Sequence, residues 1–175
     1  ADTSVRQICE KADVDIALAS YYFRDKRELF FSMVESFFPY PYSEPVAYTY
    51  RDPAAQLENI IHAIVQFSID EPELNHLLLN EMSKITGRTP RLQSILFPVF
   101  SAVKNLLDKG RREGVFSFAS TDEAMLFVLG AMWFSQPIPF LQPLLERFET
   151  DSNVPTASAN QTWQFVMSGL GTKST

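Results

Sequence analysis

The chain has 175 residues but only one cysteine and six glycines. Because Cys9 is the only thiol, no intramolecular disulfide can form, and neither a cysteine-based zinc site nor a disulfide-rich secreted scaffold fits. A cytoplasmic protein is therefore expected. The scattered glycines form no loop that would hold a phosphate, and no serine-centred nucleophile elbow occurs. These absences argue against an enzyme, and nothing in the sequence indicates a cofactor.

Long apolar runs and an excess of positive charge are also missing. The longest uninterrupted apolar run, residues 124–134, is well short of the roughly 20 residues that span a bilayer, so no membrane partner is expected. The formal net charge is −6, whereas nucleic-acid-binding proteins often have an overall basic character. Any binding of nucleic acid must therefore depend on local features of the chain.

Apolar residues recur at spacings of three and four along almost the whole chain, which predicts an all-α fold. Only Tyr40–Tyr50 has the alternating aromatic pattern of a strand. Prolines flank this stretch, so we interpret it as a loop between two helical regions, the first of which ends near Phe38. The boundary near residue 45 separates a small head, residues 1–44, from a helical-bundle body, residues 45–175.

The body contains three apolar stripes with helical spacing. The third stripe is the longest and predicts the central helix of the body. Pro98 inside it predicts a kink, and Gly110 and Gly114 predict its end. The stripes consist of Leu57, Ile60, Ile61, Ile64 and Val65; of Leu74, Leu77, Leu78, Met82 and Ile85; and of Leu92, Ile95, Leu96, Val99, Phe100, Val103, Leu106 and Leu107.

A further helix, with Thr121 as its expected N-cap, is apolar on every side from Ala124 to Phe134. A helix with one solvent-exposed face would not tolerate this pattern, so a second surface is expected to cover it. We predict a two-fold homodimer, the alternative being a helix fully buried inside a monomer. The predicted interface joins this helix to a second apolar seam near the C-terminus and comprises Leu126, Gly130, Ala131, Trp163, Val166, Met167 and Leu170.

The N-terminal head begins with two short helices joined by a tight turn. Thr3 or Ser4 provides a hydroxyl N-cap for the first helix, whose apolar face contains Val5, Ile8, Cys9 and Ala12. The turn at residues 13–15 leads to a second short helix at residues 16–23, and Asp25 can cap a third. This is the arrangement of a helix-turn-helix unit.

The segment from Ser4 to Phe30 closely resembles the DNA-binding segment of the tetracycline-repressor (TetR) family. S-V-R-Q-I-C, A-D-V and Y-Y-F-R-D-K-R-E-L-F fall in register with the family pattern without a gap. Beyond this segment only the general layout matches, including G-x-x-x-G-V-F at Gly110–Phe116. The resemblance implies a transcriptional regulator, in the usual case a repressor. Its head would bind a double-stranded DNA operator, and its body would bind a small-molecule effector and form a homodimer.

The resemblance also implies which residues meet DNA. Hydroxyl groups and free helix N–H groups can bind phosphates or base edges, and a lysine supplies positive charge. The expected contacts are Thr3, Ser4, Asp15, Ile16, Ala17, Ser20, Tyr21, Tyr22 and Lys26.

Three departures from the family pattern bear on this expectation. Asp13 stands where the family usually has glycine, although aspartate tolerates the left-handed conformation. Asp15 places a carboxylate near DNA, which is tolerable if it caps the following helix or accepts from a cytosine. The family also has an earlier helix, often with a basic arm, which we expect to precede residue 1. Residues 1–30 alone hold five basic side chains against six acidic ones.

The sequence has fifteen Phe, six Tyr and two Trp, which suit an apolar or aromatic effector. By analogy with the family, an effector among the middle helices would change the spacing of the two recognition helices. The candidate pocket residues are Phe67, Phe97, Phe100, Phe127, Trp133 and Phe134, together with Phe140, and each of them could equally be ordinary core.

Two alternatives remain open. Glu73 and His76 have the spacing of a helical di-iron site, but Glu58 and His62 do not, so we interpret both histidines as lying on solvated faces. Glu81, near Leu78 and Met82, could be a buried carboxylate that selects a polar group on a ligand. Exposed glutamate is commoner, so we expect Glu81 to be exposed and do not name it as a site. A dimeric interaction or ligand-carrier module without DNA binding is the second alternative.

Overall fold

The computed structural model describes residues 3–39, 52–136, 141–145 and 155–171. Within these ranges the chain contains eight α-helices, one short 3-10 helix and no strands, which confirms the all-α prediction. The chain divides into two compact units, Ala1–Phe38 and Pro39–Thr175. The predicted boundary at residue 45, the expected loop at residues 40–50 and Phe140 lie outside the described residues. The division into residues 1–44 and 45–175 therefore stays a prediction.

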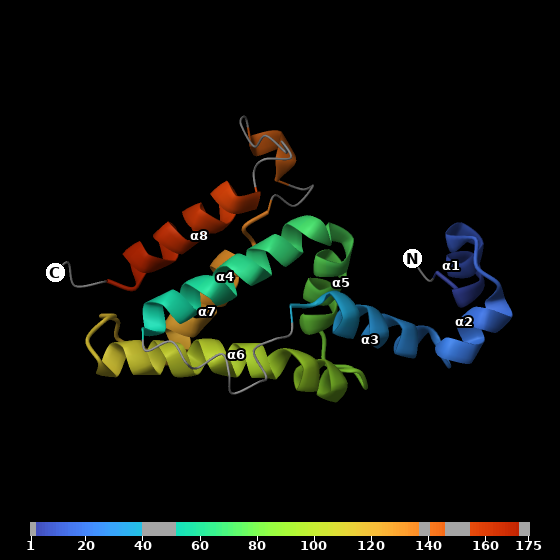
Figure 1. Cartoon of the computed structure of the whole chain (residues 1–175), viewed down its shortest axis with the longest axis horizontal. Coiled ribbons are helices and arrows are strands. Elements are labelled where there is room, and N and C mark those ends of the chain that lie inside the picture. Colours follow the sequence, from blue (N-terminus) through green and yellow to red (C-terminus); the bar gives the residue numbers. More distant parts are fainter. Residues whose placement is uncertain (1–2, 40–51, 137–140, 146–154, 172–175) are drawn as a thin grey trace. The chain divides into compact units, whose positions relative to one another are not determined.

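The N-terminal unit consists of α1 (Val5–Ala12), α2 (Ile16–Tyr22) and α3 (Lys26–Phe37) (Figure 1). A capping box starts α1. The backbone N–H of Gln7 donates to the Ser4 hydroxyl at 3.3 Å, and the Ser4 N–H donates to the Gln7 side-chain oxygen at 2.8 Å. These bonds satisfy N–H groups that the first helical turn leaves without partners. Of the two hydroxyls considered from the sequence, Ser4 is therefore the N-cap.

Asp25 caps α3, as its position before the third apolar pattern predicts. Its carboxylate accepts from the backbone N–H groups of Glu28 at 2.9 Å and Arg27 at 2.8 Å. The bond from Glu28, assisted by those from Arg27, holds the pKa of the Asp25 carboxyl below its ordinary value. The helix ends where expected, with Phe38 as its C-cap.

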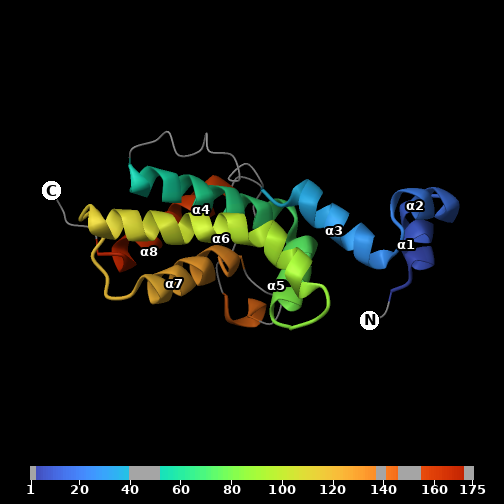
Figure 2. The ribbon, with the colours of Figure 1, turned by 90° about the horizontal axis from the view of Figure 1, so that it is seen from below.

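The second unit is a bundle around α4. Within it, α4 packs against α5, α6, α7 and α8. Figure 1 shows α4 between α8 and α6, and Figure 2 shows the long α6 running beside α4. The helices are α4 (Pro53–Asp70), α5 (Pro72–Met82), α6 (Thr89–Arg112), α7 (Thr121–Trp133) and α8 (Pro155–Gly169), with a 3-10 turn at Gln142–Leu144.

The first and third predicted stripes form the core of this unit. All five residues of the α4 stripe are almost completely buried, as are seven of the eight residues of the α6 stripe. The exception is Phe100, which is half-buried. Pro98 lies inside α6 as expected. Burial of these side chains from two neighbouring helices accounts for the close packing of α4 against α6.

The second stripe was predicted only in part. Leu74 and Leu78 are buried, but Leu77 is 39% exposed and Ile85 is 98% exposed. The helical period does not extend to Ile85 because α5 ends at Met82. A polar residue, Asn75, shares the buried face of α5 with the two leucines.

One predicted N-cap was wrong, and one predicted helix end was confirmed only in part. Ser120 is the N-cap of α7, where its hydroxyl accepts from the Glu123 N–H at 3.3 Å. Thr121 instead donates its hydroxyl to Asp108 at 2.6 Å and so links α7 to α6. At the other end of this connection, Gly110 lies inside α6, which continues to Arg112. Gly114, the other predicted end, directly follows the C-cap Glu113 and has φ 74°, as a glycine that ends a helix does.

Gly110 has a packing role. A Cβ atom at this position would overlap the Phe116 ring, so only glycine lets the buried ring rest against the helix. We expect Gly110→Ala to destabilise the protein by about 1–3 kcal/mol through overpacking. Denaturant unfolding of this variant measures the effect. Gly87→Ala is the matched control because a Cβ there meets nothing within 4 Å. Equal stability of the two variants would contradict this account.

Candidate functional site

The turn between α1 and α2 depends on Asp13, which has φ 54° and ψ 42°. Among the described residues it is the one non-glycine residue with positive φ. Its backbone N–H reaches the carbonyl groups of Cys9 and Glu10, and the N–H of Val14 donates to Cys9 at 3.0 Å. The aspartate thus adopts the left-handed conformation that glycine usually provides, and the tight helix-turn-helix geometry is preserved.

Asp15 directs its carboxylate toward its own helix. Its Oδ1 atom accepts from the backbone N–H of Ala17 at 2.6 Å, so Asp15 is the N-cap of α2. Sequence analysis predicted that an acidic residue here is tolerable if it caps the following helix or accepts from a cytosine. The structure shows the first of these two roles. The cap fixes where a seven-residue helix begins, and such a short helix would be marginal alone.

The surface of α2 is exposed almost all round, and no residue of this helix is buried. Tyr21 and Tyr22 are 81% and 68% exposed, and their rings meet edge to face with centroids 5.3 Å apart. Ser20 is exposed one position earlier. The end of α2 therefore presents hydroxyl groups on rigid aromatic rings, which suit hydrogen bonds to phosphates or base edges.

The remaining predicted DNA contacts lie in the same compact unit. Thr3, Ser4 and Lys26 are exposed at the beginnings of α1 and α3. Two basic side chains of this unit are engaged by acidic neighbours. Arg6 pairs with Glu10 at 3.2 Å, and Arg27 pairs with its neighbour Asp25. These pairs reduce the local positive field.

Within the described residues, the aromatic residues proposed for a ligand pocket lie in different surroundings. Phe67 and Trp133 are buried and meet edge to face with ring centroids 6.4 Å apart. Phe127 and Phe134 lie exposed on α7 and just after it. The pair on α6, Phe97 and Phe100, lines a pocket formed with the end of α5.

This α5–α6 pocket contains a residue that the sequence analysis placed wrongly. The Glu81 side chain is only 11% exposed and pairs with Arg88 at 3.0 Å, whereas we expected an exposed glutamate. Arg88 lies in the connection after α5, and no spacing rule predicts that such a connection folds back onto the helix.

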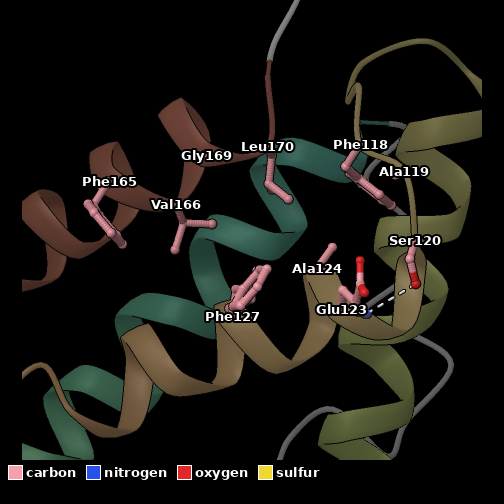
Figure 3. Close-up of a pocket in the computed structure, with 11 residues that line it drawn as sticks. Phe118, Ala119, Ser120, Glu123, Ala124, Phe127, Phe165, Val166, Gly169 and Leu170 are labelled. Atoms are coloured by element: carbon pink, nitrogen blue, oxygen red, sulfur yellow. Dashed lines mark hydrogen bonds between the residues drawn. The ribbon is translucent and has the colours of Figure 1, made fainter.

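A second hollow is the groove between α7 and α8, which has a volume of about 180 Å³. Figure 3 shows the Phe127 side chain from α7 and Val166 and Leu170 from the α8 side pointing into it, with Phe118 at one end. Glu123 and Ser120 provide polar atoms near Phe118. The groove is otherwise apolar.

The predicted dimer residues occupy different environments around this groove. Val166 and Leu170 are buried within the single chain, so they support the α8 packing rather than an outer surface. Leu126 is 67% exposed, and Gly130, Ala131, Trp163 and Met167 are half-buried. Sequence analysis missed Phe165, which is 74% exposed beside the groove. The apolar periodicity of α8 alone does not distinguish its inner from its outer side.

The histidines do not form a metal site in the part of the chain described. His76 is exposed, whereas His62 is half-buried with a buried Nε2 atom that has no hydrogen-bond partner. The expectation that His62 is solvated was therefore wrong. No group of three His, Cys, Asp or Glu residues there could hold a metal ion. The described helices also include none that is long and apolar enough to cross a membrane.

The arrangement of a three-helix head and a helical body defines the class of fold. It is the fold of TetR-family transcriptional regulators, which confirms at the level of the fold the resemblance seen near the N-terminus. Comparison with protein-family models and with curated protein sequences gives no match.

Three solved structures illustrate the likeness. HlyIIR, a hemolysin II transcriptional regulator, has a TM-score of 0.70 at 22% identity, with 98% of this chain and 87% of that chain covered. A regulatory protein of the TetR family from Rhodococcus RHA1 has a TM-score of 0.73 at 14% identity, covering 98% and 88%. The TetR-family regulator PfmR from Thermus thermophilus has a TM-score of 0.69 at 14% identity, covering 99% and 87%. These neighbours are regulators rather than enzymes.

The Asp15 cap provides a test of the geometry of α2. We expect Asp15→Ala to destabilise the head by about 1 kcal/mol because the Ala17 N–H loses its partner. Asp15→Asn should be close to wild type because asparagine caps helices equally well. Hydrogen exchange of the α2 amides distinguishes the variants. Equal protection of α2 in the alanine and asparagine variants would show that the cap is unimportant.

Proposed function

We propose that this chain is a TetR-like transcriptional regulator, in the usual case a repressor, that binds double-stranded operator DNA through α2. The observation that carries this proposal is the exposed α2 of a helix-turn-helix unit, with Ser20, Tyr21 and Tyr22 on its surface. A helix held this way fits the major groove, which is wide enough to admit an α-helix. The fold shared with known regulators supports the same function.

Contacts to phosphate and contacts to bases would come from different parts of this unit. The Thr3 hydroxyl at the N-terminus of α1 offers a donor to a phosphate. The hydroxyl and backbone N–H of Ser4 donate to the Gln7 side chain and would exchange that partner for the phosphate. Lys26 at the start of α3 supplies positive charge. The exposed residues of α2, which are Asp15, Ile16, Ala17, Ser20, Tyr21 and Tyr22, would face base edges or the sugar-phosphate backbone. Only the α2 contacts would read sequence directly.

We propose further that two copies associate through α7 and α8. Leu126, Phe127, Phe134 and Phe165 are each more than 60% exposed in the single chain. Exposed side chains of this size on two adjacent helices are typical of a covered interface. A two-fold dimer would also present two copies of α2 to two half-sites about 34–36 Å apart.

A small-molecule effector bound in the body would control this dimer. An effector can shift the equilibrium only if it binds one arrangement of the body more tightly than the other. An arrangement that changes the distance between the two heads would lose simultaneous contact with both half-sites.

DNA binding is tested with labelled fragments from around the protein's own gene, titrated at two salt concentrations. Specific retention of one fragment that weakens strongly with salt is expected. Tyr21→Phe removes only an exposed hydroxyl and should weaken retention severalfold. Because each copy in the dimer contributes one Lys26, Lys26→Gln should reduce the slope of log affinity against log salt by about 2. Arg112→Gln, which removes one positive charge from an exposed position at the end of α6, is the control.

If a folded dimer retained no DNA fragment at low salt, the proposal that the chain is a DNA-binding regulator would be contradicted. It would favour the second candidate, a dimeric interaction or ligand-carrier module without DNA binding.

The dimer is tested by sedimentation at micromolar concentration. Phe165→Glu places a charge on the exposed apolar side of α8 and should give a monomer with unchanged helix content, because the side chain is 74% exposed in the chain. Asn105→Glu adds the same charge at an exposed position of α6 and should remain dimeric. A monomeric wild-type protein would overturn the proposed interface.

A further inference from the structure

We infer that the pocket between the end of α5 and the first half of α6 binds a small molecule with an apolar or aromatic ring and a carboxylate group. This inference rests on the proposed function, because it assigns the effector site of the proposed regulator and the chemical class of its effector. The residues that line the pocket and carry the argument are Glu81, Lys84, Leu92, Leu96, Phe97 and Phe100.

The size and walls of the pocket suit one ring. Its volume is about 140 Å³, close to the roughly 150 Å³ of an apolar cavity that accommodates benzene. Leu92 and Leu96 are buried at its base, while Phe97 is 50% exposed. The Phe97 and Phe100 rings lie 6.5 Å apart with their planes tilted by 40°. A ligand ring beside them would cover apolar surface that the chain leaves in contact with water.

The charges of the pocket favour an anion. The Glu81 carboxylate is nearly buried, and Arg88 neutralises it at 3.0 Å. Lys84 lines the same pocket and makes no ion pair with the described residues. The positive charge of Lys84 is therefore not neutralised by an acidic side chain of the pocket. A carboxylate on the ligand would compensate it, with the Thr89 hydroxyl and the Gln93 amide also on the pocket lining.

A cationic ligand is disfavoured by the same geometry. It would have to replace Arg88 at Glu81, and the guanidinium would lose its 3.0 Å charge-assisted hydrogen bond. It would also lie beside Lys84, whose like charge would repel it. A neutral ring gains only the apolar contact. Anionic, neutral and cationic ligands are thus expected to bind in this order of decreasing affinity.

The connection between α5 and α6 is already arranged around the pocket. The Thr86 N–H donates to the Thr89 hydroxyl oxygen at 2.9 Å, and the Arg88 N–H donates to the Thr86 hydroxyl oxygen at 3.2 Å. These bonds fix the backbone on both sides of Gly87 and hold Arg88 near Glu81. A ligand that binds here would therefore meet a preformed site and lose little free energy in ordering it.

The proposal is tested by titrating the full chain with three probes that share one ring: phenylacetate, benzyl alcohol and benzylamine. Titration calorimetry, with amide chemical shifts to locate the site, should show phenylacetate binding at least about tenfold tighter than benzylamine. Tenfold corresponds to about 1.4 kcal/mol. Shift changes should centre on residues 81–100. Preference for benzylamine, or no binding of any probe by folded protein, would overturn the proposal.

Three variants assign the roles of individual side chains. Lys84→Gln should weaken phenylacetate about two- to fivefold and leave benzyl alcohol unchanged, because an exposed charge contributes modestly. Phe97→Ala should weaken phenylacetate and benzyl alcohol alike. Glu81→Gln should tighten phenylacetate, since Arg88 is then free to pair with it, and tighter binding cannot result from misfolding. Loss of phenylacetate binding in Glu81→Gln would contradict the assignment.

Two comparisons complete the design. Lys11→Gln removes the same charge from the N-terminal unit and should bind all three probes as wild type does. Because these titrations contain no DNA, their outcome is independent of DNA retention. Protein that binds phenylacetate in the expected pattern but retains no DNA fragment would contradict the proposed regulator and support the pocket. Protein that retains a DNA fragment but binds none of the probes would support the proposed regulator and contradict the proposed pocket.

Discussion

The body of this protein depends on the burial of one face of α4. Leu57, Ile61 and Val65 on this face are completely buried, and α5, α6, α7 and α8 all pack against the same helix. Each fully buried aliphatic side chain of this kind contributes about 1.5–3 kcal/mol. Because the other four helices share α4 as their partner, its apolar stripe determines which side of each of them is turned inward.

The packing on α4 also decides what is left outside. Val128 and Met132 of α7 turn inward and are buried, so Leu126 and Phe127 of the same helix remain exposed. Within one chain, therefore, only one apolar side of α7 is buried. Likewise, the end of α5 and the connection after it leave Phe97 beside an open pocket. The core around α4 leaves some apolar side chains exposed. These exposed side chains form the proposed dimer surface and the proposed effector site.

The head is stabilised differently, through local hydrogen bonds at helix ends. Its three helices contain 8, 7 and 12 residues, and each begins with a side-chain cap from Ser4, Asp15 or Asp25. Two of these caps are carboxylates, which favour the positive end of a helix but add negative charge to a surface proposed to face DNA. The capping bonds partly resolve this conflict, because each carboxylate is directed to its own helix backbone.

The sequence by itself determined the all-helical fold, the helix-turn-helix head, and the stripes of α4 and α6, because these depend on period and on capping bonds within four residues. Tertiary structure decided the rest. Apolar period alone could not show that Val166 is buried while its neighbour Phe165 is exposed, or that Ile85 lies past the end of α5. Nor could it show that Arg88 folds back to Glu81, because that pairing depends on the path of the connection between two helices. Side-chain burial and pocket formation depend on contacts between distant segments, which a local pattern does not contain.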